Sequence, residues 1–119
     1  MAVVGVGNCA SSLVQGIAFY RDAAGAPAAG LMHAELGGYR VGDIDVVAAF
    51  DVAGGKVGRD LADAILAGPN NTVAFAQVAA TGVEVQRGPT MDGLGKHLRE
   101  MVEESAAPPI DVAEAFIRG

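Results

Sequence analysis

A chain of 119 residues is long enough for one domain with a hydrophobic core and too short for two ordinary domains. Hydrophobic residues make up 51% of it and aromatic residues only 5%, without tryptophan, which is typical of an α/β core built from small side chains. The net charge of -6, from 14 acidic and 8 basic residues, argues against nucleic-acid backbones and anionic membrane surfaces as partners.

Residues 3–17 predict a short strand, a glycine-rich turn and a helix, in that order. The turn is Gly5-x-Gly7-x-x-Ala10, the pattern of a nucleotide-binding βαβ unit in the variant that ends in alanine. Gly5 permits the tight turn, Gly7 lets a pyrophosphate approach the backbone, and Ala10 lets the helix lie close to the strand. Amides from Asn8 onward would offer a diphosphate unpaired donors at the positive end of the helix. The alternative is a glycine-rich turn that merely precedes an amphipathic helix.

The helix after this turn is expected to end near Tyr20 or Arg21. The residues predicted on its inner face are Ala10, Leu13, Val14 and Ile17. Residues 23–30 are turn formers and small residues, and they predict a loop. Residues 31–36 are predicted as one short helical turn that is closed by residues 37–38, both glycines.

The clearest predicted strand covers residues 44–50, which are almost continuously apolar, as in a strand buried on both faces. It ends at Asp51, where dinucleotide-binding folds place the acid that binds the adenosine ribose. The usual gap from the glycines is about 20 residues. Here 46 residues separate Gly5 from Asp51, and the loop over residues 22–42 accounts for the excess. The alternative role for Asp51 is an acidic cap on the following turn.

A second helix is predicted next and is ended by Gly68-Pro69. Its predicted inner face is Val57, Leu61, Ala64, Ile65 and Leu66. Lys56 and Arg59 near its start could accept a 2′-phosphate, but the carboxylate of Asp51 would repel one, which favours NAD over NADP. Asp60 either reaches the adenosine side of the pocket or simply interacts favourably with the helix N-terminus.

The last third of the chain predicts one more strand and two helices. Residues 83–85 are the expected third strand. The loop over residues 88–93, in which Thr90 and Asp92 are capping residue types, leads into a helix with an inner face of Leu94, Leu98, Met101 and Val102. Residues 110–117 predict a final helix with Ala113, Phe116 and Ile117 facing inward.

The fold class that follows is α/β, with one domain over residues 1–119. We expect an incomplete Rossmann-like doubly wound parallel sheet, the first half, with about three strands and flanking helices. Its first strand would have an unpaired edge, so self-association or marginal stability is expected. One cysteine, Cys9, and two isolated histidines, His33 and His97, predict neither a disulfide nor a metal site. A reducing, cytoplasmic setting follows, and no stretch approaches the 18 apolar residues of a membrane span.

Six blocks of the sequence occur together in a fixed order, namely residues 4–16, 30–33, 48–52, 56–61, 70–72 and 87–95. In this order they resemble the N-terminal part of the bacterial and archaeal type of myo-inositol-1-phosphate synthase (inositol-3-phosphate synthase). The resemblance extends over nearly the whole chain and is far more specific than the glycine turn alone.

The resemblance implies an isomerase that binds NAD in a Rossmann domain and uses it catalytically. D-glucose 6-phosphate would be oxidised, enolised, closed by an intramolecular aldol step and reduced to 1D-myo-inositol 3-phosphate. It also implies a cytoplasmic homotetramer that serves inositol and phospholipid biosynthesis. By matching motifs, the residues around the cofactor would be Gly5, Gly7, Asn8, Cys9 and Ala10 at the diphosphate, and Asp51 and Asp60 on the adenosine side. Cys9 would contribute its backbone.

The family continues beyond these blocks into a substrate and tetramerisation domain that carries its catalytic lysines. No catalytic residue is therefore assigned in this chain, and Lys56 and Lys96 are not assigned that role. Glucose 6-phosphate is expected to bind only to the full-length enzyme, and this chain is expected to be inactive alone. Two alternatives stay open: a free-standing dinucleotide-binding module without catalysis, and a domain of another NAD-dependent dehydrogenase.

Overall fold

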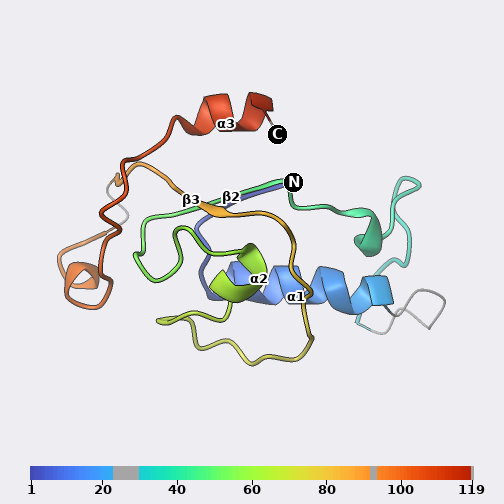
Figure 1. The fold of residues 1–119 in the computed structure, drawn as a ribbon. Helices are drawn as coiled ribbons and strands as arrows, with labels where there is room; N and C mark the ends of the chain where they lie inside the picture. Colours follow the sequence, from blue (N-terminus) through green and yellow to red (C-terminus); the bar gives the residue numbers. More distant parts are fainter. Residues whose placement is uncertain (23–29, 92–93, 119) are drawn as a thin grey trace.

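A three-stranded parallel sheet forms the centre of the computed structural model, which describes residues 1–22, 30–91 and 94–118 (Figure 1). Its strands are β1 (Ala2–Val4), β2 (Ala48–Asp51) and β3 (Val85–Arg87), side by side in the order β1-β2-β3. Val4 lies opposite Phe50, and Asp51 lies opposite Arg87. The carboxyl ends of all three strands therefore meet at one edge of the sheet, which confirms the predicted incomplete Rossmann-like α/β fold.

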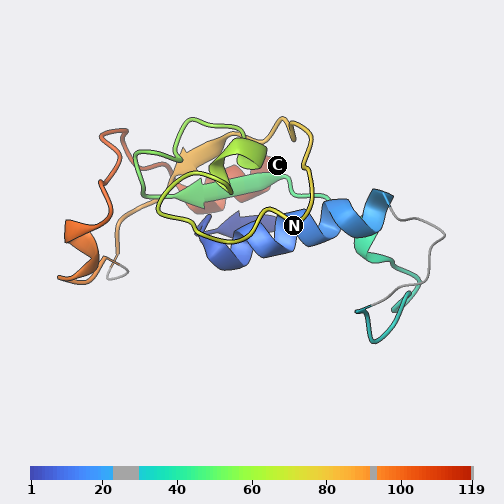
Figure 2. The same cartoon turned by 90° about the horizontal axis from the view of Figure 1, so that it is seen from below.

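Helices cover both faces of this sheet. The long helix α1 (Asn8–Asp22) and the short helix α2 (Leu61–Ala64) lie on one face, and α3 (Val112–Arg118) lies on the other (Figures 1 and 2). Two 3₁₀ turns, η1 (Val41–Asp43) and η2 (Leu98–Glu100), interrupt the connections. The main core lies between the sheet, α1 and α2, and consists of Val3, Val6, Ala10, Val14, Ala49, Leu61, Ala64, Ile65 and Val85. These are mostly small or β-branched residues, which pack well on a pleated surface.

The second face of the sheet is only partly covered. Phe50 stacks on Phe116 of α3, with ring centroids 5.8 Å apart and planes inclined by 30°. Val4, which lies opposite Phe50 on the neighbouring strand β1, is 72% exposed. The helix α3 thus protects β2 and leaves β1 bare on this face.

The two edges of the sheet also differ. Beyond β3, residues 58–61 run alongside the chain, and Val85 exchanges two backbone hydrogen bonds with Gly58 and Arg59, each 2.8 Å long. On the outer side of β1, no segment in the described part of the chain forms a strand pair. One edge is therefore closed and the other is open.

The second helix is shorter than predicted, and the inner face of α1 differs from the prediction at one residue. The second helix covers Leu61–Ala64 only, because Gly58 has a φ of +85° and residues 58–61 pair with the chain that enters β3. In α1, Leu13 is 47% exposed, whereas Ser11 and Gln15 are buried, and Gln15 binds the backbone of residues 73 and 75. The inner face predicted for α1 is therefore wrong at Leu13.

Two further helical predictions are wrong. Residues 31–36 form no helix, but residues 37–38 do turn the chain, with φ values of +60° and +85° that favour glycine. Instead of the helix predicted from Leu94, the structure has the single turn η2, after which residues 103–105 lie extended against residues 52–54. The predicted inward-facing residues Leu98, Met101, Ala113 and Ile117 are exposed.

The predicted loop over residues 23–29, together with Asp92, lies outside the described residues. Within the described ranges, no helix combines the length and the apolar character that a membrane span requires.

The open edge predicts concentration-dependent self-association. Replacing Val4 by lysine is expected to reduce it, because a charge on an edge strand opposes pairing with another chain. Sedimentation velocity over a range of concentrations measures the effect. Val73→Lys is the matched control, since Val73 is similarly exposed (76%) but lies in a loop. A wild-type chain that stays monomeric, with a sharp thermal transition independent of concentration, would contradict the prediction.

Candidate functional site

The glycine-rich turn lies at the carboxyl edge of the sheet, between β1 and α1. Gly5 has a φ of +88°, a conformation that side chains with a Cβ rarely adopt, and its N–H donates to the carbonyl of Phe50 at 2.8 Å. Gly7 differs, because its φ is not positive and a Cβ built on it would meet no protein atom within 4 Å. The fold itself therefore explains the glycine at position 5, but not the one at position 7.

Free donors follow the turn at the start of α1. The first helical hydrogen bond runs from Ser11 N–H to the carbonyl of Gly7 at 2.9 Å. Among the residues described, none accepts a hydrogen bond from the amides of Gly7, Asn8, Cys9 or Ala10. The first turn of α1 carries no acidic side chain, so the positive end of the helix dipole is not neutralised there. This arrangement favours an anion such as a diphosphate.

The Val6 peptide groups are held from inside the protein by three side chains. The N–H of Val6 donates to Asp51 Oδ2 at 2.7 Å, and its carbonyl accepts from Lys56 Nζ at 2.7 Å and from Asn70 Nδ2 at 3.0 Å. Val6 itself is fully buried. The shape of the turn is thus fixed by contacts with residues that are distant in sequence.

Asp51 lies at the tip of β2 beside the glycine turn. In addition to the contact with Val6, its Oδ1 accepts from the amides of Val52 and Ala53 at 2.7 and 2.9 Å. The carboxylate therefore faces the turn, where an acid that binds ribose is expected, and it also caps the chain that follows β2. Both roles considered from the sequence are geometrically compatible.

The side chain of Asn8 is used within the protein. Its Oδ1 accepts from the amides of Asn71 and Thr72 at 2.9 and 3.1 Å and from the Thr72 hydroxyl at 2.8 Å. Two turns further along α1, Gln15 Oε1 accepts from the amides of Phe75 and Ala76. The side-chain oxygen of Asn8 is therefore engaged within the protein. Cys9 is exposed and its thiol is free.

Lys56 lies in the interior, although its sequence position suggested a surface contact with a 2′-phosphate. Its side chain is almost completely buried, with 4% exposure, and its ammonium also donates to Asn70 Oδ1 at 2.8 Å. It is therefore not available to a 2′-phosphate at the surface. A sequence signal for its partner exists in the polar run Asn70-Asn71-Thr72, which the sequence comparison used only as one of the six ordered blocks.

Asp60 does not lie beside the glycine turn. It forms a bridge with Glu84 just before β3, whereas Asp51 pairs with Arg87 at the end of β3. Its carboxylate caps α2 by accepting from the amide of Ala62 at 2.8 Å. The same carboxylate accepts from the amides of residues 81 and 82 and from the hydroxyl of residue 81. The structure thus brings Asp51, but not Asp60, to the turn.

These contacts perturb the ionisation of Asp60. Burial raises the pKa of its carboxyl, but the hydrogen bonds from the amides of Thr81, Ala62 and Gly82 and from the Thr81 hydroxyl outweigh that effect and lower the pKa below its ordinary value of 3.8. Asp60 therefore stabilises the fold as a carboxylate.

Arg87, at the tip of β3, lies opposite Asp51 at the carboxyl edge of the sheet. Its buried guanidinium donates to Glu104 at 2.6 Å and to the Thr90 hydroxyl at 2.7 Å. Thr90 in turn donates to Glu104, so the prediction that Thr90 caps a helix is wrong. This cluster holds residues 103–105 beside the tip of β2.

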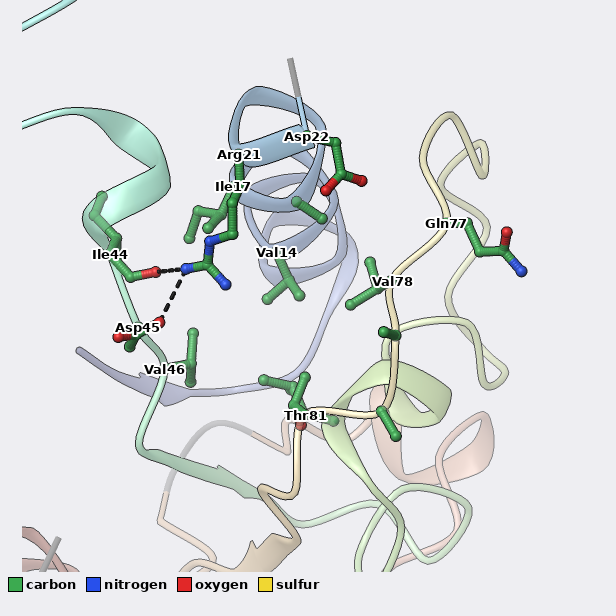
Figure 3. Close-up of a pocket in the computed structure, with 14 residues that line it drawn as sticks. Val14, Ile17, Arg21, Asp22, Ile44, Asp45, Val46, Gln77, Val78 and Thr81 are labelled. Atoms are coloured by element: carbon green, nitrogen blue, oxygen red, sulfur yellow. Dashed lines mark hydrogen bonds and ion pairs between the residues drawn. The ribbon is translucent and has the colours of Figure 1, made fainter. Parts of the chain in front are cut away.

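A separate pocket of about 320 Å³ lies along the second half of α1 (Figure 3). Val14 and Ile17 of α1, with Val46 and Val78 from two loops, point into it, and the ion pair Arg21–Asp45 of 2.9 Å lies at its rim (Figure 3). Its lining includes neither the glycine turn nor Asp51. In the part of the chain that is described, no cluster of side chains could hold a metal ion.

A parallel sheet, a glycine turn with free amides at the head of a helix, and an acid at the next strand tip together define an incomplete α/β fold of the Rossmann type. Comparison with solved structures agrees: the crystal structure of Ari2 matches 75% of this chain with a TM-score of 0.67 and 41% identity, over 28% of its own length. No family model matches the chain.

The sequence relatives are more specific. The chain is 54% identical over 98% of its length to a protein of Corynebacterium glutamicum named inositol-3-phosphate synthase. It is 55% and 54% identical, over 98% of its length, to proteins of that name from Mycobacterium tuberculosis and Mycolicibacterium smegmatis. The chain spans 32% of the length of each. The resemblance inferred from the sequence blocks is therefore confirmed, and the length is consistent with an N-terminal part.

The lowered pKa of Asp60 predicts acid sensitivity. Because the folded pKa lies below the unfolded value near 3.8, the stabilisation is complete above that value and is lost as the pH falls through the folded pKa. Asp60→Ala is expected to lower the unfolding free energy at neutral pH by about 1–2 kcal/mol, the usual cost of a lost helix cap. It is also expected to flatten the acid dependence.

Urea unfolding at neutral pH and at several values below 3.8 measures both effects. Asp63→Ala is the control, because Asp63 lies exposed in the first turn of the same helix. Equal acid dependence of the wild type and Asp60→Ala would refute the prediction.

Proposed function

We propose that this chain is the NAD-binding part of an inositol-3-phosphate synthase; the names of its relatives support the synthase, and the geometry of the glycine turn supports NAD. The full-length enzyme would convert D-glucose 6-phosphate to 1D-myo-inositol 3-phosphate by oxidation, enolisation, intramolecular aldol cyclisation and reduction. It would be a cytoplasmic homotetrameric isomerase of inositol and phospholipid biosynthesis. The groups that act on the sugar phosphate would lie outside this chain, so the chain alone would be inactive.

One observation carries the NAD proposal: Gly7 is a glycine that the fold does not require. A Cβ at this position would meet no protein atom within 4 Å, and Gly7 is the first of four successive residues, 7–10, whose amides have no acceptor among the residues described. A glycine is needed there if another molecule approaches the backbone closely. The bare helix terminus and the absence of an acidic side chain in its first turn suit a diphosphate.

In this proposal each part of the site has a distinct role. The backbone of Gly5, Gly7, Asn8, Cys9 and Ala10 surrounds the diphosphate, and the carboxylate of Asp51 accepts hydrogen bonds from the adenosine ribose. When bound, NAD supplies reversible hydride transfer, and the residues of this chain bind and orient it. For Asp60, an adenosine-side role rests on the resemblance alone, since it pairs with Glu84 before β3, whereas Asp51 pairs with Arg87 at the end of β3 beside the glycine turn.

Gly7→Ala tests this proposal directly. The methyl group would occupy the place of a phosphate oxygen, so NAD affinity measured by calorimetry is expected to fall by about tenfold or more. The unfolding free energy is expected to change by less than about 1 kcal/mol, since the new group meets no protein atom. Gly16→Ala is the matched control: it lies within α1, has equal space, and should leave NAD affinity unchanged while stabilising the helix. Unchanged NAD affinity in Gly7→Ala would refute the proposal.

Asp51→Ala tests the ribose role. Because Asp51 also holds Val6, some loss of affinity for inorganic diphosphate is expected. The loss for NAD should be clearly larger, and the preference for NAD over NADP should narrow, since a carboxylate that repels a 2′-phosphate has been removed. Calorimetry with the three ligands measures both effects. Equal losses for NAD and diphosphate would rule out a contact with the ribose.

A further inference from the structure

Lys56 places a positive charge inside the protein without a carboxylate partner. Its side chain is 4% exposed, and no ion pair in the described residues includes it. Its ammonium donates to two neutral oxygens, the carbonyl of Val6 at 2.7 Å and Asn70 Oδ1 at 2.8 Å. Removing a charge from water is unfavourable unless strong hydrogen bonds replace the lost hydration. The buried ammonium of Lys56 therefore makes a strong hydrogen bond to the Val6 carbonyl.

The Val6 carbonyl belongs to the same peptide unit as the N–H of Gly7. The only cis peptide bond among the described residues is Gly68-Pro69, so the unit between Val6 and Gly7 is trans. In a planar trans peptide, the C=O and N–H bonds point in opposite directions. Because Lys56 and Asn70 hold the carbonyl toward the interior, the N–H of Gly7 must point away from it.

Lys56 also strengthens the Gly7 donor. A hydrogen bond from a cation to a carbonyl polarises the peptide unit and makes its N–H a better donor. The positive charge is buried, where solvent screens it less than a surface charge. Asn70 fixes the arrangement from a second direction, since its Nδ2 also donates to the carbonyl of Ile65, which ends α2.

We propose that Lys56 is a positioning residue, which aims and polarises the Gly7 N–H toward the diphosphate of a bound dinucleotide. This inference rests on the function proposed above. Lys56 touches no ligand in this role and acts only through the peptide unit between Val6 and Gly7. The role differs from the surface contact with a 2′-phosphate that its sequence position suggested.

Ligand binding by Lys56→Met tests the inference, because methionine keeps most of the side-chain volume without the charge. Affinity for adenosine diphosphate is expected to fall about tenfold, as for a lost charge-assisted hydrogen bond, while affinity for adenosine stays within about twofold. Lys96→Met removes the same charge from an exposed position and should change neither affinity. Equal losses for the two ligands, or no loss for adenosine diphosphate, would overturn the inference.

Nuclear magnetic resonance of the wild-type chain provides a test that does not depend on a variant folding. On titration with inorganic diphosphate, the amide proton of Gly7 should shift at least as strongly as those of residues 8–10. In folded Lys56→Met, the free Gly7 amide should move upfield as its polarisation is lost. If the Gly7 amide is unaffected by diphosphate while the amides of residues 8–10 respond, the role of Lys56 is refuted and the proposed function is not. A wild-type chain that binds neither NAD nor diphosphate refutes the proposed function itself.

Discussion

The structure depends on how the peptide groups of Val6 are held. Its N–H and C=O are fully buried, and in such a position each must find a partner inside the protein. The partners are Asp51 from the tip of β2, Lys56 from the turn after it and Asn70 from the loop beyond α2. Three residues that lie 45, 50 and 64 positions after Val6 therefore meet at it. The same contacts fix the conformation of the turn whose amides form the candidate site.

Side chains, more than regular secondary structure, hold the connection between β2 and β3. The helix in this connection has a single turn, and the chain from residue 70 to residue 82 has no regular element. Asn8 and Gln15 of α1 bind the backbone of residues 71–76, and Asp60 binds that of residues 81–82. Each of these side chains accepts from two to four donors, which satisfies amides that a longer helix would otherwise pair internally. The long helix α1 thus has two roles: its first turn carries the free amides, and its side chains hold the connection between β2 and β3.

The sequence allowed the βαβ start, the parallel sheet and the position of Asp51 to be predicted, because each depends on local patterns. Glycine spacing, a continuous apolar run and an acid at its end are all visible within a few residues. The burial of Lys56 and the location of Asp60 at the far end of β3 depend on hydrogen bonds across long sequence separations, which no local pattern contains. Apolar spacing also predicted a helix at residues 94–102, but spacing cannot show whether a surface exists for the helix to pack against.

The difference between the two sheet edges determines where a further strand can be added to the sheet. Beyond β3, the backbone of Val85 is already saturated by residues 58–59, and the carbonyl of Arg87 accepts from Ile110. Beside β1, nothing in the described chain competes with an incoming strand. The sheet can therefore be extended only at β1, the first strand in the sequence. The added strand could come from the same polypeptide or from another copy. Relatives about three times as long have ample chain for such an extension, and it would need no change in the closed half of the domain.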